Sequence, residues 1–404
     1  MTIPTVSPAL PYLDIMDPAF HPDGAEVRAA RAAHWCARTP MGFAVLRYDK
    51  LTALLADRRL RQGTFRILSA QGLTEGPLVE WLNSTILSVE GDDHTRLRRL
   101  VSRAFTPRAV SELRPRMSEI ANELVDRFPG DGPVDFMEAF ADPYPARVIC
   151  ELLGVPREQH DAFRGWANDL GLAFSFTAAA NVERIEAALE GLHAATDALL
   201  AQRRARPTDD LLSALIAAEA DGSRLSTEEL RTMVTALLFA GQDTTRHQLG
   251  NAIATFLCHP DQWTLLARQP ELAAQAVEEV VRVVPTVPLT SRIATEDLEI
   301  DGVAIPADSH LALFLATGNT DQAAFGTDAD RFDITASRQQ QLTFGGGIHY
   351  CLGAYLARIE MVEALPLLAR RLGPIEPDGD PTWRPAMGIA GPVTLPIRFR
   401  REAP

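Results

Sequence analysis

The sequence predicts a mainly α-helical fold with a small β-rich portion. Apolar residues recur with a helical period over long stretches, most clearly over residues 108–205 and from Ser226 to about Leu257. Alternation with a period of two is confined to short segments. Residues 298–305, with a central Asp301-Gly302, give the best hairpin signal. Because no internal repeat and no linker-like composition interrupts the chain, we expect residues 1–404 to form a single domain.

Composition narrows the classes of function. Hydrophobic residues make up 46% of the 404 residues, enough for a sizeable core, and the net charge of −14 argues against general nucleic-acid binding. The four cysteines are too widely spaced for a metal-binding pair or a disulfide framework, as is typical of a reducing compartment. They are Cys36, Cys150, Cys258 and Cys351. Neither a signal-peptide pattern nor ~18 uninterrupted apolar residues occur. We therefore expect a soluble, cytoplasmic protein without a membrane anchor.

The N-terminal part is predicted to alternate short elements. We expect an irregular stretch over residues 1–24, a helix over 25–38, a strand over 42–48 and a short helix over 48–56. Residues 62–88 mix glycines with apolar side chains, which indicates a long loop with short helices. Long, partly apolar connections in compact proteins are frequently functional.

The next predicted helix, over residues 91–105, divides its charged side chains between two faces. At about 100° per residue, His94 and Arg98 fall on one face. The roughly opposite face carries three further arginines, Arg96, Arg99 and Arg103. A solvated basic helix is the ordinary interpretation of such a run. The division nevertheless allows the His94–Arg98 pair to point inward at an anion while the other arginines stay outside.

Residues 108–205 are predicted to be mostly helical. Breaks are expected at 129–133, 142–145 and 154–156, with an interruption at 170–177. Ser226 and Glu229 then form a capping box that opens a long helix, which His259-Pro260 stops.

The centre of that long helix combines residues that suit a helix poorly. Gly241 and two threonines lower helix propensity, and Asp243 follows an apolar run, where burial is costly. An exposed polar turn is one interpretation. However, a conflict between propensity and pattern is expected at functional sites, and a threonine hydroxyl such as that of Thr244 can bond a backbone carbonyl.

Further along, a helix is predicted over 271–284, in which Glu279 and Arg282 lie three residues apart on one face. A surface ion pair is the common interpretation of that spacing. The tail from Pro374 is rich in proline and glycine and ends in an alternating segment, 393–399, which indicates strands.

The stretch from Leu342 to Arg358 has the most specific pattern in the chain. Three glycines before Cys351 form a tight loop whose backbone can approach a flat ligand closely, and a helical pattern follows the cysteine. A helix N-terminus stabilises a thiolate, which is a ligand for a soft metal such as haem iron. A buried, inert cysteine is the commoner fate of a single Cys.

The spacing Phe-Gly-x-Gly-x-His-x-Cys-x-Gly closely resembles the haem-binding loop of the cytochrome P-450 superfamily. Its residues here are Phe344, Gly345, Gly347, His349, Cys351 and Gly353. Three other segments match the family in its order. His94 and Arg98 resemble its helix C, Ala240-Gly-Gln-Asp-Thr-Thr245 resembles its helix I, and Glu279-Val-Val-Arg282 resembles its helix K.

The resemblance implies the P-450 fold, with one haem b between a long central helix and the Cys-loop helix. It implies Cys351 as the iron ligand, Phe344 as a shield of the sulfur, and Asp243 with Thr244 as an acid–alcohol pair that relays protons. Candidates to neutralise the haem propionates are His94, Arg98, Arg292 and His349. A structural network would comprise Glu279, Arg282 and Arg331.

The implied reaction inserts one oxygen atom of O2 into a small molecule, and the resemblance also suggests the pocket. Its lining would be mostly apolar, which favours a lipophilic or aromatic substrate such as a secondary metabolite, terpenoid or steroid. The candidates are Leu78, Trp81, Ile86, Leu87, Leu237, Ala240, Val287, Leu289 and Ile389.

Electrons must come from a partner, because the chain has no flavin or iron–sulfur motif. We expect a ferredoxin served by a ferredoxin reductase, docking on Arg96, Arg99 and Arg103 near Cys351.

Two alternatives share most of these features. A non-catalytic haem-thiolate protein would need the cysteine and the propionate groups but not the acid–alcohol pair. An enzyme for oxidative coupling or rearrangement would share the whole pattern. The Arg-Pro pair that replaces the helix I pair in peroxide-driven members is absent.

Overall fold

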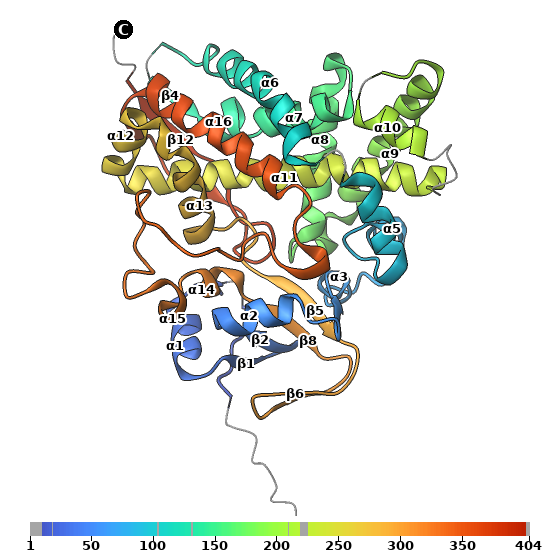
Figure 1. Cartoon of the computed structure of the whole chain (residues 1–404), viewed down its shortest axis with the longest axis vertical. Coiled ribbons are helices and arrows are strands. Elements are labelled where there is room, and N and C mark those ends of the chain that lie inside the picture. The colour runs from blue at the N-terminus through green and yellow to red at the C-terminus, as the bar shows by residue number, and fades with distance from the viewer. Residues whose placement is uncertain are drawn as a thin grey trace, which may run out of the picture.

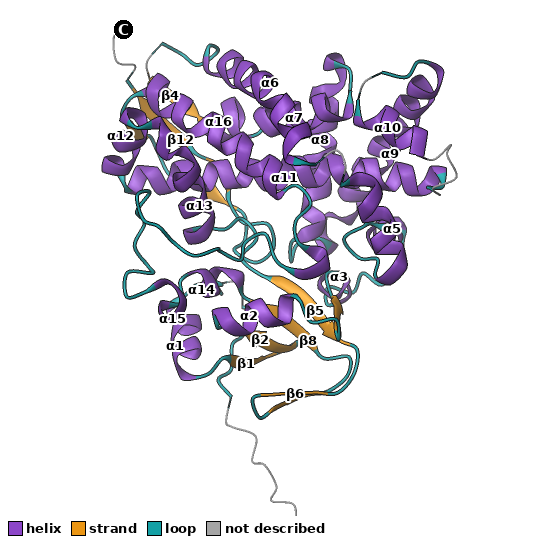
Figure 2. Cartoon of the chain, in the orientation of Figure 1, coloured by secondary structure: helices purple, strands orange, loops and turns teal. Residues whose placement is uncertain are grey.

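A large helical part and a smaller part built around a five-stranded sheet lie side by side (Figure 1). The computed structural model describes residues 10–17, 19–102, 105–130, 132–208, 210–218 and 225–400. Helices dominate and strands form only small sheets (Figure 2), which confirms the predicted fold class.

The helices surround one long element, α11, which crosses the helical part (Figure 1). Their bounds are α1 Ala25–Ala33, α2 Tyr48–Leu55, α3 Phe65–Ser69, α4 Pro77–Ser84, α5 Gly91–Val101, α6 Pro107–Val125, α7 Pro143–Leu153, α8 His160–Leu170, α9 Val182–Ala205, α10 Leu211–Ala218, α11 Thr227–Cys258, α12 Pro260–Arg268, α13 Ala273–Val283, α14 Leu315–Asn319, α15 Gln322–Phe325 and α16 Ala354–Leu372. A π-helical turn (Met137–Ala141) precedes α7, and a 3-10 turn (Gly171–Phe174) follows α8.

The strands form four small sheets. The largest has the order β1-β2-β8-β5-β3, in which only β2 and β8 are parallel, and the others are β4-β12-β9, β10-β11 and β6-β7. Their bounds are β1 Cys36–Thr39, β2 Gly42–Val45, β3 Leu60–Gln62, β4 Gly132–Asp135, β5 Thr290–Ala294, β6 Leu298–Ile300, β7 Val303–Ile305, β8 His310–Leu313, β9 Ile375–Pro377, β10 Thr382–Trp383, β11 Pro392–Thr394 and β12 Pro396–Phe399.

The capping box predicted for α11 is present in full. Ser226 Oγ accepts from the Glu229 backbone N–H at 3.1 Å, and Glu229 Oε2 accepts from the Ser226 N–H at 2.8 Å. The helix is buried along most of its length between α7, α8 and α9. Gly241 explains how closely α7 packs, because a methyl group there would lie 2.8 Å from the Ile149 side chain. The poor helix former is therefore retained for a close helix–helix contact.

The structure confirms the predicted hairpin and changes the predicted bounds of two helical segments. The hairpin at 298–305 is confirmed, with β6 and β7 joined by Asp301 and Gly302 at positive φ. The helix expected over 25–38 ends at Ala33, because Cys36–Thr39 pairs with β2. The break expected at 142–145 is confined to Asp142, between the π-helical turn and α7. Pro143 is the first residue of α7, where a missing backbone N–H costs no helical hydrogen bond.

Two general features agree with the composition. No helix among the described residues is long and apolar enough to cross a membrane. All four cysteines are free thiols.

Candidate functional site

The loop before Cys351 is closed by its own backbone. Gly345 N–H donates to Leu342 O at 2.7 Å, and Cys351 N–H donates to Phe344 O at 2.9 Å. Gly347 has a φ of 65°, and a methyl group there would lie 2.5 Å from Leu55 O in α2. The loop therefore requires glycine at this position both for its turn and for its contact with α2.

The helix after this loop begins later than expected. The prediction placed Cys351 directly at a helix N-terminus, but α16 begins at Ala354 with Gly353 as its N-cap. The sulfur nevertheless receives an N–H group from Gly353. A single backbone amide, and not the open end of a helix, thus supports the thiolate.

The environment of Cys351 differs from that of the buried cysteines. Burial raises the pKa of Cys36 and Cys150 to about 12. Desolvation also raises the pKa of Cys351, because protein surrounds the sulfur on most sides, although the residue as a whole is exposed. The Gly353 N–H and the guanidiniums of Arg98 and Arg358 oppose this rise. Cys351 is accessible and has cations beside it, as a thiolate ligand requires.

Near the Cys loop lie His94, Arg98 and Arg292, which we call the cation cluster. Arg98 donates to the Tyr350 carbonyl, and Arg292 donates to Ser291 O at 2.8 Å and to Gln62 Oε1 at 3.3 Å. Neither arginine forms an ion pair with any carboxylate that the structure describes. Burial lowers the pKa of Arg292 to about 10 and lowers that of His94.

Glu90 is a member of this region that the sequence analysis missed. It is the N-cap residue of α5, and its Oε1 accepts from the Gln62 N–H at 2.6 Å and lies 3.0 Å from His349 Nε2. The His349 ring lies 4.6 Å from the His94 ring, centroid to centroid. Glu90 thus ties His349 to β3, so His349 has a carboxylate partner within the chain, which the cation cluster lacks.

These residues fit a haem group. The His94 Nε2 atom is buried and has no hydrogen-bond partner among the described residues. Arg98 and Arg292 form no ion pair with a described carboxylate, although the charge of Glu90 acts on Arg292 from a distance. A thiol suited to iron lies on the same loop as Tyr350, to which Arg98 is bonded. A soft ligand beside donors for two carboxylates matches the chemistry of an iron porphyrin with its propionates.

On α11, Asp243 is fully buried in a second group of charges, which we call the Asp243 cluster. It comprises Asp243, Arg246, His247, Arg384 and Asp142. Asp243 Oδ2 accepts from Arg384 Nη1 at 2.8 Å, and Oδ1 lies 3.4 Å from Arg246 Nη2. Desolvation raises the pKa of Asp243, but the two guanidiniums outweigh it and hold the pKa below its usual value.

Thr244, the other member of the expected pair, is half-buried beside Asp243. Its hydroxyl donates to the Ala240 carbonyl at 2.9 Å, the backbone contact anticipated for a threonine in this helix. The acid and the alcohol are neighbours in sequence, but their polar atoms have different partners.

The network around Glu279 differs from the expectation in its third member. Arg282 is fully buried and makes a bidentate pair with Glu279, with both N–O distances 2.8 Å. The Arg331 side chain is 69% exposed, and only its carbonyl accepts from Arg282. Arg338 is the arginine whose side chain approaches Glu279, at 4.0 Å. The third cation is therefore Arg338, because Arg331 points to solvent and pairs with Asp333.

The pocket candidates divide by burial. Leu78, Trp81, Leu237, Leu289 and Ile389 are buried, whereas Ile86, Leu87, Ala240 and Val287 are partly exposed. Hydrogen bonds between Thr286 and Ala390 join the segment that carries Val287 to the segment that carries Ile389. Ala390 N–H donates to Thr286 O at 2.8 Å, and Thr286 Oγ1 donates to Ala390 O at 2.7 Å. Val287 and Ile389 are therefore held close together by backbone.

The three arginines expected at a docking face do not form one exposed group. Arg96 bonds Glu229 at the start of α11 and Asp93 on its own helix, so its charge is already engaged. Arg99 is exposed. Arg103 lies outside the described residues.

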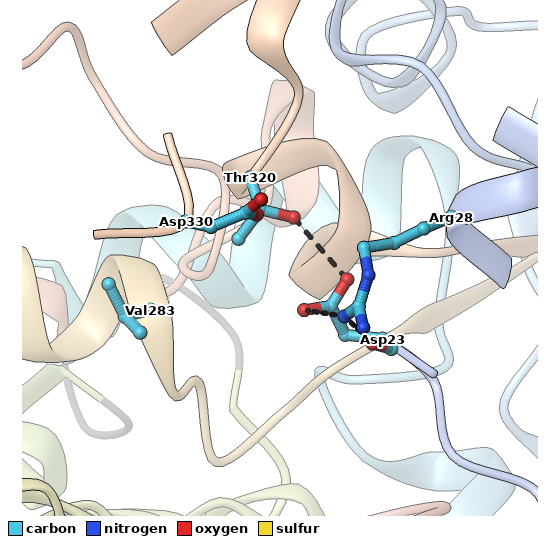
Figure 3. Close-up of a pocket in the computed structure, with 5 residues that line it drawn as sticks. All are labelled: Asp23, Arg28, Val283, Thr320 and Asp330. Atoms are coloured by element: carbon cyan, nitrogen blue, oxygen red, sulfur yellow. Dashed lines mark hydrogen bonds and ion pairs between the residues drawn. The ribbon is translucent and has the colours of Figure 1, made fainter. Parts of the chain in front are cut away.

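A separate pocket lies away from these clusters (Figure 3). It is lined by Asp23, Arg28, Val283, Thr320 and Asp330. Arg28 and the Thr320 hydroxyl both contact the Asp23 carboxylate, so its polar groups already satisfy one another.

Comparison with known proteins identifies the family of the chain. The model of the family described as Cytochrome P450 matches residues 172–268 and 266–382. Over 398 residues the chain is 43% identical to luteothin monooxygenase of Streptomyces thioluteus, covering 96% of each chain. It is 39% identical to the mycinamicin IV hydroxylase/epoxidase of Micromonospora griseorubida, covering 89% of this chain and 91% of the relative.

Solved structures share the architecture. The tirandamycin C-bound P450 monooxygenase TamI matches with a TM-score of 0.82 at 34% identity, covering 96% of this chain and 100% of the other. The predicted family and fold are therefore confirmed.

Proposed function

Because this chain belongs to the cytochrome P450 family and its curated relatives are monooxygenases, we propose that it inserts one oxygen atom of O2 into a lipophilic small molecule of secondary metabolism. The balanced reaction consumes the substrate, O2, two electrons and two protons, and yields the oxygenated product and water. The observation that carries this proposal is the accessible Cys351 thiol, near two arginines that form no ion pair with a carboxylate in the described part of the chain. The single domain expected over residues 1–404 remains a prediction.

Haem b is the cofactor that these residues fit, and when bound it supplies the iron at which O2 is activated. Cys351 would ligate the iron, and the cation cluster would hold the propionates. His349 would act mainly through Glu90, which it contacts at 3.0 Å. The Phe344 ring, with the Arg358 guanidinium 4.2 Å from its centroid, would cover the sulfur side.

Proton transfer is assigned to α11. Asp243 is the only carboxylate of the described α11 residues that is fully buried, and Thr244 is next to it. We propose that Asp243 takes up protons that enter through the protein and that the Thr244 hydroxyl passes them toward the reacting oxygen. Burial of the surrounding helix excludes bulk water, which limits loss of electrons to peroxide.

The substrate is proposed from the lining residues and from the relatives. The candidates on α4, on α11 and around Val287 and Ile389 are apolar, which favours a molecule with a large hydrophobic surface. The relatives named above act on luteothin and mycinamicin IV, according to their names. We propose a substrate of comparable kind, a largely apolar secondary metabolite.

Electrons are proposed to come from a ferredoxin with its reductase. An acidic ferredoxin needs a local positive surface, because this chain carries −14 overall. Arg99 is the arginine of α5 that remains exposed for this contact, since Arg96 is engaged by Glu229.

The haem ligand provides the test of this function. In Cys351→Ala, the strongly red-shifted absorption band of the reduced carbon-monoxide complex should disappear, because a thiolate ligand produces that band. The same substitution at Cys150, which is buried and lies on α7, is the matched control and should leave the band in place. A band that survives in Cys351→Ala would disprove the assignment.

A further inference from the structure

Among the described residues, a single charged side chain from outside its own helix contacts Asp243. Arg246 and His247 follow it on α11, whereas Arg384 comes from the loop between β10 and β11, some 140 residues away. The Arg384–Asp243 bond, at 2.8 Å, is the shortest polar contact of this carboxylate, and its other oxygen, Oδ1, has no hydrogen bond. Arg384 therefore fixes the orientation of a group that the proposed function uses for proton transfer.

The other groups that face Asp243 are already engaged. Arg246 donates to Asp142 Oδ1 at 2.9 Å and contacts His247 Nε2 at 2.9 Å. His247 Nδ1 lies 3.1 Å from the Pro392 carbonyl, so Nδ1 carries the hydrogen and Nε2 accepts from Arg246. Burial lowers the pKa of His247 to about 3, which keeps this ring neutral. His247 thus orients Arg246 and supplies no proton itself.

A chain of polar contacts connects this cluster to solvent. Asp142 also accepts from Arg164 Nη1 at 3.1 Å and from Asn168 Nδ2 at 3.0 Å, both on α8. Arg164 in turn pairs with Asp161, whose side chain is 85% exposed. Asp142 thus links the α8 surface to Arg246, and through Arg246 to Asp243.

The loop that carries Arg384 also touches the segment after α8. Gly388 bridges to Ser175, and a methyl group at Gly388 would lie 2.2 Å from Phe174 O. Within the same segment, a methyl group at Gly171 would lie 2.5 Å from Asp243 Oδ2. The segment 171–175 and the Arg384 loop thus enclose the carboxylate together, and the loop is anchored by the Arg384 N–H to Gly391 O bond of 2.9 Å.

We propose that Arg384 is a positioning residue for the oxygenation reaction. It holds the Asp243 carboxylate ionised and oriented, so that Asp243 takes up an incoming proton in a position from which the Thr244 hydroxyl can receive it. This inference rests on the proposed function. It adds a residue outside every motif by which the family was identified, carried by the C-terminal loop.

The test uses the holoenzyme with a ferredoxin and its reductase. The variants are Arg384→Gln, Arg384→Lys and Asp243→Asn. The matched control is Arg398→Gln, because Arg398, on β12, forms an ion pair with Asp378 at the surface. Product formed per electron pair is measured between about pH 5 and pH 9. The infrared band of protonated Asp243, assigned by its loss in Asp243→Asn, is followed down to about pH 3, because the pKa of Asp243 lies below its ordinary value.

In Arg384→Gln, we expect the Asp243 band to appear at higher pH than in the wild type and product per electron pair to fall about tenfold near pH 7, with peroxide accounting for the difference. Arg384→Lys should restore most of both, because it returns the positive charge. Arg398→Gln should match the wild type. A loop that merely packs would show no rescue by lysine and no shift of the Asp243 band.

The inference is overturned if Arg384→Gln keeps the wild-type titration and coupling, or if lysine and glutamine behave alike. The proposed function fails separately, through a wild-type protein that lacks the carbon-monoxide band or forms no product. The infrared titration of Asp243 would still report on Arg384 in that case.

Discussion

Two groups of charges in this protein both contain arginine and histidine but are balanced differently. In the Asp243 cluster, two arginines (Arg246 and Arg384) face two carboxylates (Asp243 and Asp142) at 2.8 to 3.4 Å. In the cation cluster, Arg98 and Arg292 are bonded to carbonyl and amide oxygens and to no carboxylate that the structure describes.

This difference indicates what each group is for. Buried charges are costly unless they are paired, so a cluster that neutralises itself supports the folded chain, whereas one with unmatched cations is completed by an anion from outside. The Asp243 cluster should therefore matter for the stability of the chain, and the cation cluster for retention of a bound anionic cofactor.

The largest effect that would sharpen this contrast is expected for Arg246→Gln. The substitution leaves the fully buried Asp243 and the partly buried Asp142 with one fewer cation. Breaking a buried pair in this way costs about 3–5 kcal/mol of unfolding free energy. Urea denaturation measures it. Arg164→Gln is the matched control: Arg164 also contacts Asp142 but is 29% exposed, so a loss below about 1 kcal/mol is expected. Equal losses in both variants would contradict the contrast.

A smaller effect of the opposite kind is expected for Arg292→Gln. Burial already disfavours the charged form of this guanidinium. The unfolding free energy of the haem-free chain should therefore change by about 1 kcal/mol or less. The rate of haem loss, measured as transfer of haem to a haem-scavenging protein, should become about ten- to a hundredfold faster. The reason is that one charge-assisted bond to a propionate is gone. If the haem-free chain instead unfolds readily while haem retention is unchanged, Arg292 stabilises the folded chain and does not hold the cofactor.

Acid should distinguish the two clusters further. Because the folded-state pKa of Asp243 lies below its ordinary value of 3.8, ionised Asp243 contributes stability above that pH, and the contribution is lost as pH falls through the folded-state pKa. The difference in unfolding free energy between the wild type and Asp243→Asn should therefore be larger at pH 6 than near pH 3. A difference that does not vary with pH would mean that Asp243 is not held ionised.

The smallest effect is expected for Arg99, an exposed residue of α5. Arg99→Glu should slow the first electron transfer from ferredoxin severalfold at low salt and reduce its salt dependence, with substrate affinity unchanged. Arg398→Glu, on β12, is the control. Stopped-flow reduction at several ionic strengths measures both, and rates equal to the wild type at low salt would place the partner elsewhere.

The sequence by itself determined the fold class, the long helix with its capping box and the hairpin at 298–305, and it singled out Cys351 as the proposed haem ligand. These depend on local pattern and on residues close together in the chain, such as Ser226 with Glu229 or Phe344 with Cys351. Spacing along the chain is enough to recognise them.

The balance of buried charge was decided only by the tertiary structure. Whether a charged side chain finds a partner depends on residues far away in sequence: Arg384 reaches Asp243, Glu229 engages Arg96, and Arg338 replaces Arg331 beside Glu279. Glu90 escaped notice for the same reason, because its partners Gln62 and His349 come from two distant segments. Periodicity shows which face of an element a charge occupies, but desolvation and pairing are properties of the packed molecule.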